Sequence, residues 1–198
     1  MGRAPKYDDE AILDAALDLA TELGPTGTTV VAIAKRLGAP SGSIYHRFAS
    51  HDLILAHLWI RTIRRFQEGF LAAMTLEDPQ VAARAAVAHT LTWTAQNPRE
   101  AKILVLYRRE DLIALWPDEL GGELATLNDE VKHSITAFAE NQFGTVTAET
   151  IGRTRLALID QPYAAARQVI TTGAPPPLWL TNAVTAAALA ILEEKKLP

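Results

Sequence analysis

The chain has 198 residues and no cysteine, and 48% of its residues are hydrophobic, which excludes a disordered chain, disulfides, thiolate catalysis and cysteine-based zinc sites. Its formal net charge is −4, so binding to nucleic acid requires a local basic surface rather than bulk charge. The longest apolar stretch, residues 178–192, is too short to span a bilayer, and the polar N-terminus has no apolar core of a secretory signal. We therefore expect a protein that acts in the cytoplasm and not in a membrane.

Helical periodicity dominates the sequence, and no strand alternation or internal repeat is visible. We expect helices over residues 8–23, 30–37, 41–48, 78–97, 116–143, 147–172 and 178–195, with a long fourth helix that begins at residue 50 and a sixth that begins at residue 98. The helix over 147–172 should be interrupted at 160–162, because Pro162 has no backbone N–H to donate. The predicted fold class is therefore all-α.

The second and third predicted helices are short and are joined by a tight turn at Gly38. Two such helices after a longer first one are typical of a three-helix helix-turn-helix domain, which reads DNA with its third helix. Ile44 and Phe48 should anchor the third helix in the core, so that the side chains between them project outward. Small residues at the start of this helix would let its N-terminus approach bases and phosphates closely.

The charges of this segment agree with such a role. Between residues 28 and 51 the charged side chains are Lys35, Arg36 and Arg47, and no acidic residue occurs. The acidic residues of the domain are confined to the first helix. The sequence therefore predicts a locally positive face in an acidic protein.

The same segment resembles the TetR family of one-component transcription regulators. The family pattern contains a threonine pair, an Ile-Ala pair, a glycine turn, a run of small residues, Tyr-His-x-Phe, and a Ser-Lys-(Asp/Glu)-Leu start of the fourth helix. In this sequence it reads Thr28-Thr29, Ile33-Ala34, Gly38, Pro40-Ser41-Gly42-Ser43, Tyr45-His46-Arg47-Phe48 and Ser50-His51-Asp52-Leu53. The pattern covers about the first quarter of the chain, and the remaining helices fit the family in number and length.

The resemblance implies a DNA-binding domain over residues 1–49 and a helical ligand-binding and dimerisation domain over residues 50–198. The predicted DNA-binding residues are Thr28, Thr29, Pro40, Ser41, Gly42, Ser43, Tyr45, His46, Arg47 and His51. The two threonines are also expected to cap the second helix. His51 stands where the family usually has a lysine or arginine that binds a phosphate, so its contact would be weaker and would depend on pH. Ser41 replaces a frequently basic residue.

Aromatic side chains are frequent in the middle helices, and several have polar edges. Together they suggest a pocket for a small, mostly apolar molecule. The predicted pocket residues are Trp59, Ile63, Phe66, Phe70, His89, Trp93, Tyr107 and Trp116. For each of them taken singly, a place in the core of a helical bundle is an open alternative.

The final helix is apolar on two sides, which indicates burial beyond the core of one subunit. The predicted interface residues are Trp179, Leu180, Ala183, Val184, Ala187 and Ile191. A purely interior helix is the alternative interpretation. The resemblance implies a dimer interface of four helices, two from each subunit.

These features predict a homodimeric, ligand-responsive transcription regulator. By the family default it is a repressor, which a small, mostly apolar effector releases from near-palindromic double-stranded operator DNA. The alternatives are an all-helical small-molecule enzyme and an architectural DNA-binding protein. The sequence shows no phosphate loop, nucleophile elbow or pair of metal-ligand histidines, so we expect no catalytic residue, metal or cofactor. The overall acidity argues against an architectural protein.

Overall fold

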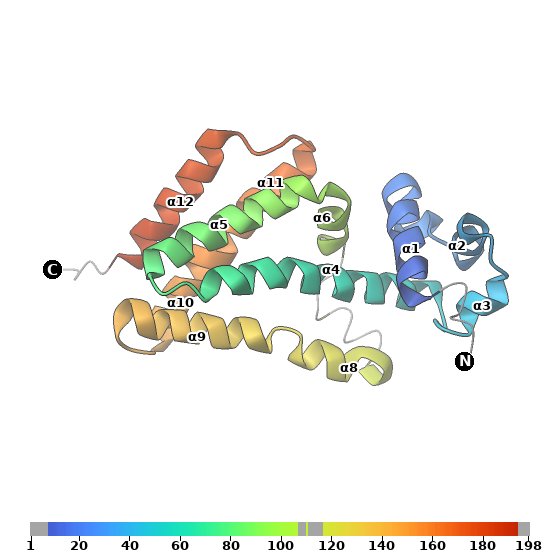
Figure 1. Cartoon of the computed structure of the whole chain (residues 1–198), viewed down its shortest axis with the longest axis horizontal. Coiled ribbons are helices and arrows are strands. Elements are labelled where there is room, and N and C mark those ends of the chain that lie inside the picture. Colours follow the sequence, from blue (N-terminus) through green and yellow to red (C-terminus); the bar gives the residue numbers. More distant parts are fainter. Residues whose placement is uncertain (1–7, 107–109, 111–116, 194–198) are drawn as a thin grey trace. The chain divides into compact units, whose positions relative to one another are not determined.

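A computed structural model describes residues 8–106, 110 and 117–193, and every regular element in these residues is helical (Figure 1). The predicted all-α fold class is confirmed. The described part of the chain divides into two compact units, one within residues 1–63 and 99–124 and the other within 64–98 and 125–198. This division concerns packing, and the functional boundary between residues 49 and 50 stays a prediction.

The first unit contains the predicted helix-turn-helix. Its elements are α1 (Asp9–Leu23), η1 (Pro25–Gly27), α2 (Val30–Leu37), α3 (Ser41–Tyr45), the first half of α4 (His51–Met74), α6 (Pro98–Leu104) and most of α8 (Pro117–Thr126). The Asp8 side chain caps α1 by accepting a hydrogen bond from the backbone N–H of Ala11 at 2.9 Å. Ile12, Ile33 and Ile44, one from each of the first three helices, are fully buried in the core of this unit.

The second unit contains the rest of α4 and further helical elements with a core of their own. These are α5 (Pro79–Gln96), α9 (Asp129–Phe143), α10 (Ala148–Arg155) with the π-helical turn η2 (Leu156–Asp160), α11 (Gln161–Thr172) and α12 (Leu178–Leu192). Both α11 and α12 lie along α5 (Figure 1), and Leu91, Phe138 and Leu158 are among the residues buried between the helices. The guanidinium of Arg153 donates to the backbone carbonyls of Ile191 and Glu193 and so closes the C-terminal end of α12.

The expected single helix over residues 116–143 is wrong, because the chain forms two helices, α8 and α9, with a break between Thr126 and Asp129. At the break, the Asn128 side chain accepts a hydrogen bond from the amide of Gln67 at 2.8 Å. Asp129 and Glu130 then occupy the first turn of α9, where the helix dipole favours negative charge. The apolar spacing continues across the break, so periodicity alone did not reveal it.

The expected interruption at 160–162 lies one turn earlier, in η2. There the backbone N–H of Gln161 donates to the carbonyl of Leu156, five residues back, which is the hydrogen bond of a π-helix. Pro162 is buried near the start of α11 and has no N–H to donate to the preceding turn. The wider turn therefore lets the chain pass the proline while remaining helical. Among the described residues, no helix is both long and apolar enough to cross a membrane.

Candidate nucleic-acid interface

A glycine turn orients α3 relative to α2. Gly38 has a φ of 63°, in the left-handed region that favours glycine, and it ends α2 as the sequence predicts. The next residue continues the turn, since the backbone N–H of Ala39 donates to the carbonyl of Ala34 at 2.9 Å. The chain then enters α3 directly after Pro40.

The inner side of α3 is anchored in the core, and its outer side is exposed. Ile44 is fully buried, and the buried ring of Phe48 packs edge-on against His57 with the ring centroids 5.3 Å apart. Between these anchors, Tyr45 is 54% exposed, and His46 is exposed as well. The arrangement provides a rigid short helix whose outer side chains are available to a partner.

The two threonines predicted to contact DNA differ in their exposure and in their hydrogen bonds. Thr29 is exposed and caps α2, accepting a hydrogen bond from the N–H of Ala32 at 3.1 Å. Thr28 is completely buried, and its hydroxyl donates to the carbonyl of Gly24 at 3.0 Å. The predicted capping role is therefore confirmed for Thr29 and wrong for Thr28, which instead fastens the turn after α1.

The small residues around the start of α3 are partly open to solvent. Pro40 and Gly42 are exposed, whereas Ser41 and Ser43 are half-buried. The hydroxyl of Ser43 donates to the carbonyl of Pro40 at 2.8 Å and tightens the first turn. A Cβ at Gly42 would meet nothing within 4 Å, so packing within this chain does not require a glycine there.

Acidic residues of α1 pair with two of the three cations on the predicted positive face. Arg36 binds Glu22 with an N–O distance of 2.6 Å and lies 3.6 Å from Asp18, and Arg47 forms an ion pair with Asp9. The hydrogen bond from Arg36 lowers the pKa of Glu22, and the same bond raises the pKa of Arg36. The net positive charge of this face is therefore smaller than the sequence suggests.

Both ring nitrogens of His51 lie close to protein oxygens. Nε2 is 3.0 Å from the carbonyl of Pro25, and Nδ1 is 2.7 Å from Oδ1 of Asp52. Both oxygens are acceptors, so only the doubly protonated imidazolium donates to each of them. A phosphate contact at His51 stays a prediction, and it would require the ring to give up one of these contacts.

The sequence did not indicate that Arg61 of α4 pairs with α1. Its side chain is only 10% exposed, and Nη1 lies 2.8 Å from Oε2 of Glu10 and 2.9 Å from Oδ1 of Asp14. Nε and Nη2 are buried and have no hydrogen-bond partner among the described residues. Glu10 and Asp14 are spaced four apart on one face of α1, and this spacing could have indicated that the face binds a basic side chain.

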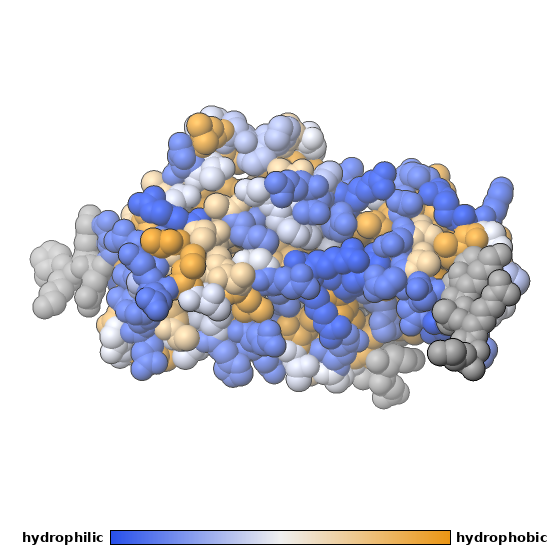
Figure 2. Space-filling view, in the orientation of Figure 1, coloured by the Kyte–Doolittle hydropathy of each residue, from blue (hydrophilic) through white to orange (hydrophobic). Residues whose placement is uncertain are grey.

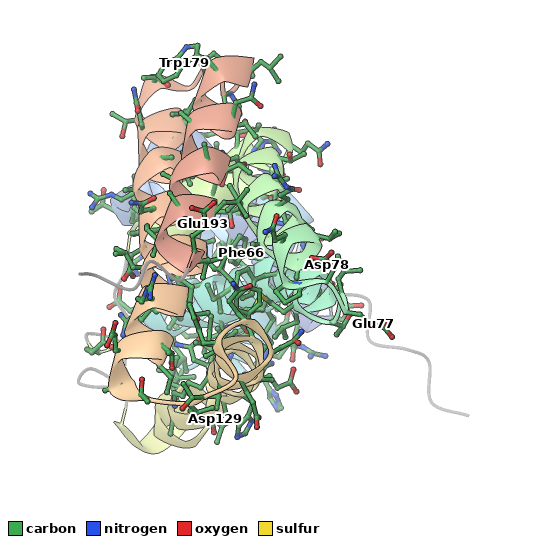
Figure 3. All side chains as sticks on the ribbon, turned by 90° about the vertical axis from the view of Figure 1, so that its left-hand side faces the viewer. Phe66, Glu77, Asp78, Asp129, Trp179 and Glu193 are labelled. Carbon is green, nitrogen blue, oxygen red and sulfur yellow. The ribbon has the colours of Figure 1, made fainter. Side chains whose placement is uncertain are left out.

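Four of the predicted pocket residues form one aromatic cluster in the second unit. Phe66 lies at its centre, inside the unit (Figure 3), with its ring centroid 6.4 Å from Phe70, 5.3 Å from His89 and 5.4 Å from Trp93. Nε2 of His89 lies 2.9 Å from the carbonyl of Phe66, so this nitrogen is the donor. Phe70 is buried, and the other three are half-buried.

Of the other four predicted pocket residues, two lie in the first unit and two lie outside the described residues. Trp59 and Ile63 lie in the first unit, where Trp59 is buried and its indole N–H donates to the carbonyl of Leu104 at 3.5 Å. Tyr107 and Trp116 lie outside the described residues. The cluster around Phe66 is therefore the part of the predicted pocket that the structure brings together.

Gly69 allows the close packing of His89 against α4, so we expect Gly69→Ala to lower the free energy of unfolding by about 1–3 kcal/mol. An added Cβ would overlap the imidazole of His89, lying 2.9 Å from Nε2 and closer still to Nδ1 and Cε1. Chemical denaturation would measure the loss. Gly152→Ala in α10 is the matched control, because a Cβ there meets nothing within 4 Å and alanine favours a helix. Equal stability of the two variants would contradict this packing.

The predicted interface residues of α12 fall on two sides of the helix. Leu180 is buried in the second unit, and Val184, Ala187 and Ile191 are half-buried. Trp179 is 64% exposed and lies at the outer end of α12 (Figure 3), and Ala183 is exposed as well. Figure 2 shows apolar surface at this end of α12. One side of the helix therefore serves the subunit's own core, and the other is uncovered.

The geometry of α2, the Gly38 turn and α3 defines a helix-turn-helix protein of the DNA-binding class. Residues 12–58 match the family of bacterial regulatory proteins named after tetR. This match identifies residues 12–58 as similar to the DNA-binding domain of that family, and the fold of the whole chain agrees with the match.

Solved structures of such regulators share the complete fold. The fatty acid degradation regulator FadR from Bacillus halodurans is 18% identical with a TM-score of 0.70, and the comparison covers 100% of both chains. A TetR transcription regulator from Haloarcula marismortui is 16% identical over 93% of this chain and 95% of its own, with a TM-score of 0.69. A transcriptional regulator from Rhodococcus sp. Rha1 is 25% identical over 94% and 96%, with a TM-score of 0.63. A comparison with curated proteins found no match.

Proposed function

We propose that this protein is a homodimeric repressor that binds a near-palindromic operator and is released by a small, mostly apolar effector. The observation that carries the proposal is the exposed outer side of α3, with Tyr45 and His46 presented by a helix whose inner side is locked in the core. Tyr45, His46 and Ser41 would contact base edges, and Thr29 would contact a phosphate. The DNA-binding domain would span residues 1–49, and residues 50–198 would bind the effector and the second subunit.

The uncovered side of α12 supports the dimer. Trp179, Ala183, Ala186 and Ala190 form one exposed stripe along this helix. Small side chains let a helix of a second copy approach closely, and the exposed tryptophan would be buried at the end of the contact. We infer that this stripe faces the second subunit and that Leu180 on the opposite side belongs to the core. In the dimer, the two α3 helices would enter successive major grooves about 34–36 Å apart.

The aromatic cluster around Phe66 supports an apolar effector. Phe66 and Phe70 lie on α4, the same continuous helix that carries Arg61, the ion-pair partner of α1. An effector that displaces these aromatic rings would therefore act on a helix bound to the DNA-binding domain. Only an effector with different affinities for the DNA-bound and free states would release the operator.

Selection of duplex fragments from a random pool by the purified protein tests the proposal directly. We expect enrichment of an inverted repeat, because a two-fold symmetric dimer reads two half-sites of opposite orientation. The location of this sequence in the genome would indicate the regulated genes and the chemical class of the effector. Candidate effectors of that class would then have to weaken binding to the selected fragment. A pool without any enriched sequence would refute the proposed operator recognition.

A further inference from the structure

Arg47 lies two residues after the end of α3 and is bound by Asp9, the first residue of α1. One Nη of its guanidinium forms an ion pair with Oδ1 of Asp9. The side chain of Arg47 is 28% exposed and that of Asp9 is 61% exposed, so solvent and solutes reach the pair. Both residues lie in the first unit, and this contact is therefore internal to the DNA-binding part of the molecule.

The position of Arg47 makes it a candidate to bind DNA phosphate. Phe48 is buried and Tyr45 is exposed, so the backbone at Arg47 passes from the outer side of α3 back to the core. A guanidinium at this place would reach a phosphate beside the groove that α3 enters. In the structure, however, a carboxylate already neutralises it, and a phosphate would have to compete with Asp9 for the same N–H donors.

The structure shows no need for Asp9 in forming α1. Asp8, not Asp9, provides the cap of this helix, and Glu10 keeps a negative charge in its first turn. Among the described residues, the Asp9 side chain pairs with Arg47, and exposed ion pairs add little to stability. An acidic residue at the edge of a DNA-binding surface also repels phosphate. The Asp9 carboxylate therefore opposes DNA binding at this place, although it is not the cap of α1.

We propose that Asp9 restrains DNA binding by holding Arg47, so that the affinity for DNA is set below what the reading helix alone would give. The proposal rests on the proposed role of α3 in reading DNA. Asp9 is a positioning residue: it does not touch DNA, and it acts through the charge and orientation of Arg47. Binding of DNA exchanges the carboxylate for a phosphate on the guanidinium.

The test is Asp9→Asn, compared with Asp14→Asn on the same helix. Each change removes one negative charge, but Asp14 pairs with Arg61 of α4 and not with a residue of the α3 region. Binding of the selected duplex and of a mixed-sequence duplex would be titrated at several salt concentrations. We expect Asp9→Asn to raise the affinity by about two- to fivefold more than the control does. The slope of log K against log salt should stay close to that of the wild type, because Arg47 binds the same phosphate in both complexes.

The same two substitutions, made in a protein that lacks Arg47, distinguish an effect through Arg47 from a general effect of charge. In the Arg47→Gln protein, Asp9→Asn should change affinity and salt slope no more than Asp14→Asn does, because the partner of Asp9 is gone. The inference is overturned when Asp9→Asn and Asp14→Asn behave alike in the wild-type background, or when Asp9→Asn weakens binding. A wild-type protein that binds no duplex refutes the proposed function itself, whereas normal selection of an operator with equal variants refutes only the role of Asp9.

Discussion

Operator affinity is expected to fall by roughly a hundredfold or more when Tyr45 and His46 are both replaced by alanine, since each lost base contact costs about 1–3 kcal/mol. Both side chains are exposed, so the folded state should keep its stability and its oligomeric state. Fluorescence anisotropy with the selected duplex would measure the affinity, and thermal unfolding would verify the fold.

His133→Ala provides a control for this variant, because His133 is an exposed histidine on α9 in the other unit. It should leave operator binding unchanged. The residual binding of the double variant should also lose its preference for the selected sequence over a scrambled one, because phosphate contacts do not depend on sequence. A folded double variant with the affinity and preference of the wild type would show that α3 does not read DNA.

Ala186→Arg is expected to convert the proposed dimer into a monomer and to weaken operator binding by at least about tenfold. Ala186 is exposed on the uncovered stripe of α12, so an arginine there fits the isolated subunit but places two unpaired charges in a symmetric interface. Loss of the dimer disconnects the two half-site contacts, which lowers the effective concentration of the second α3. Sedimentation velocity would give the oligomeric state.

The substitution must lie on the uncovered side of α12, so that it tests the interface and not the core of the subunit. Val184 is half-buried against the core of its own subunit, and a charge there would destabilise the monomer as well. Ala137→Arg on α9 is the matched control, since Ala137 is exposed on a helix outside the proposed interface. It should stay dimeric and bind the operator normally. A dimeric Ala186→Arg protein would place the interface elsewhere.

Local sequence determined the helices and the shape of the helix-turn-helix. Gly38 marks the turn because only glycine adopts its positive φ without strain, and Ile44 and Phe48 mark the buried side of α3 by their spacing. Thr29 could be recognised as a cap because capping involves residues three apart. The break before Asp129 escaped prediction, since apolar spacing continues through it and a contact from Gln67 on another helix stabilises it.

Tertiary structure alone decided which charges meet and which side of α12 is covered. Sequence spacing showed that α12 is apolar on two sides, but only its packing along α5 buries Leu180 and leaves Trp179 exposed. The pair of Arg47 with Asp9 joins residues 38 positions apart, and no local rule relates them. Backbone conformation depends on near neighbours, whereas the partner of a long charged side chain depends on how whole helices are placed against each other.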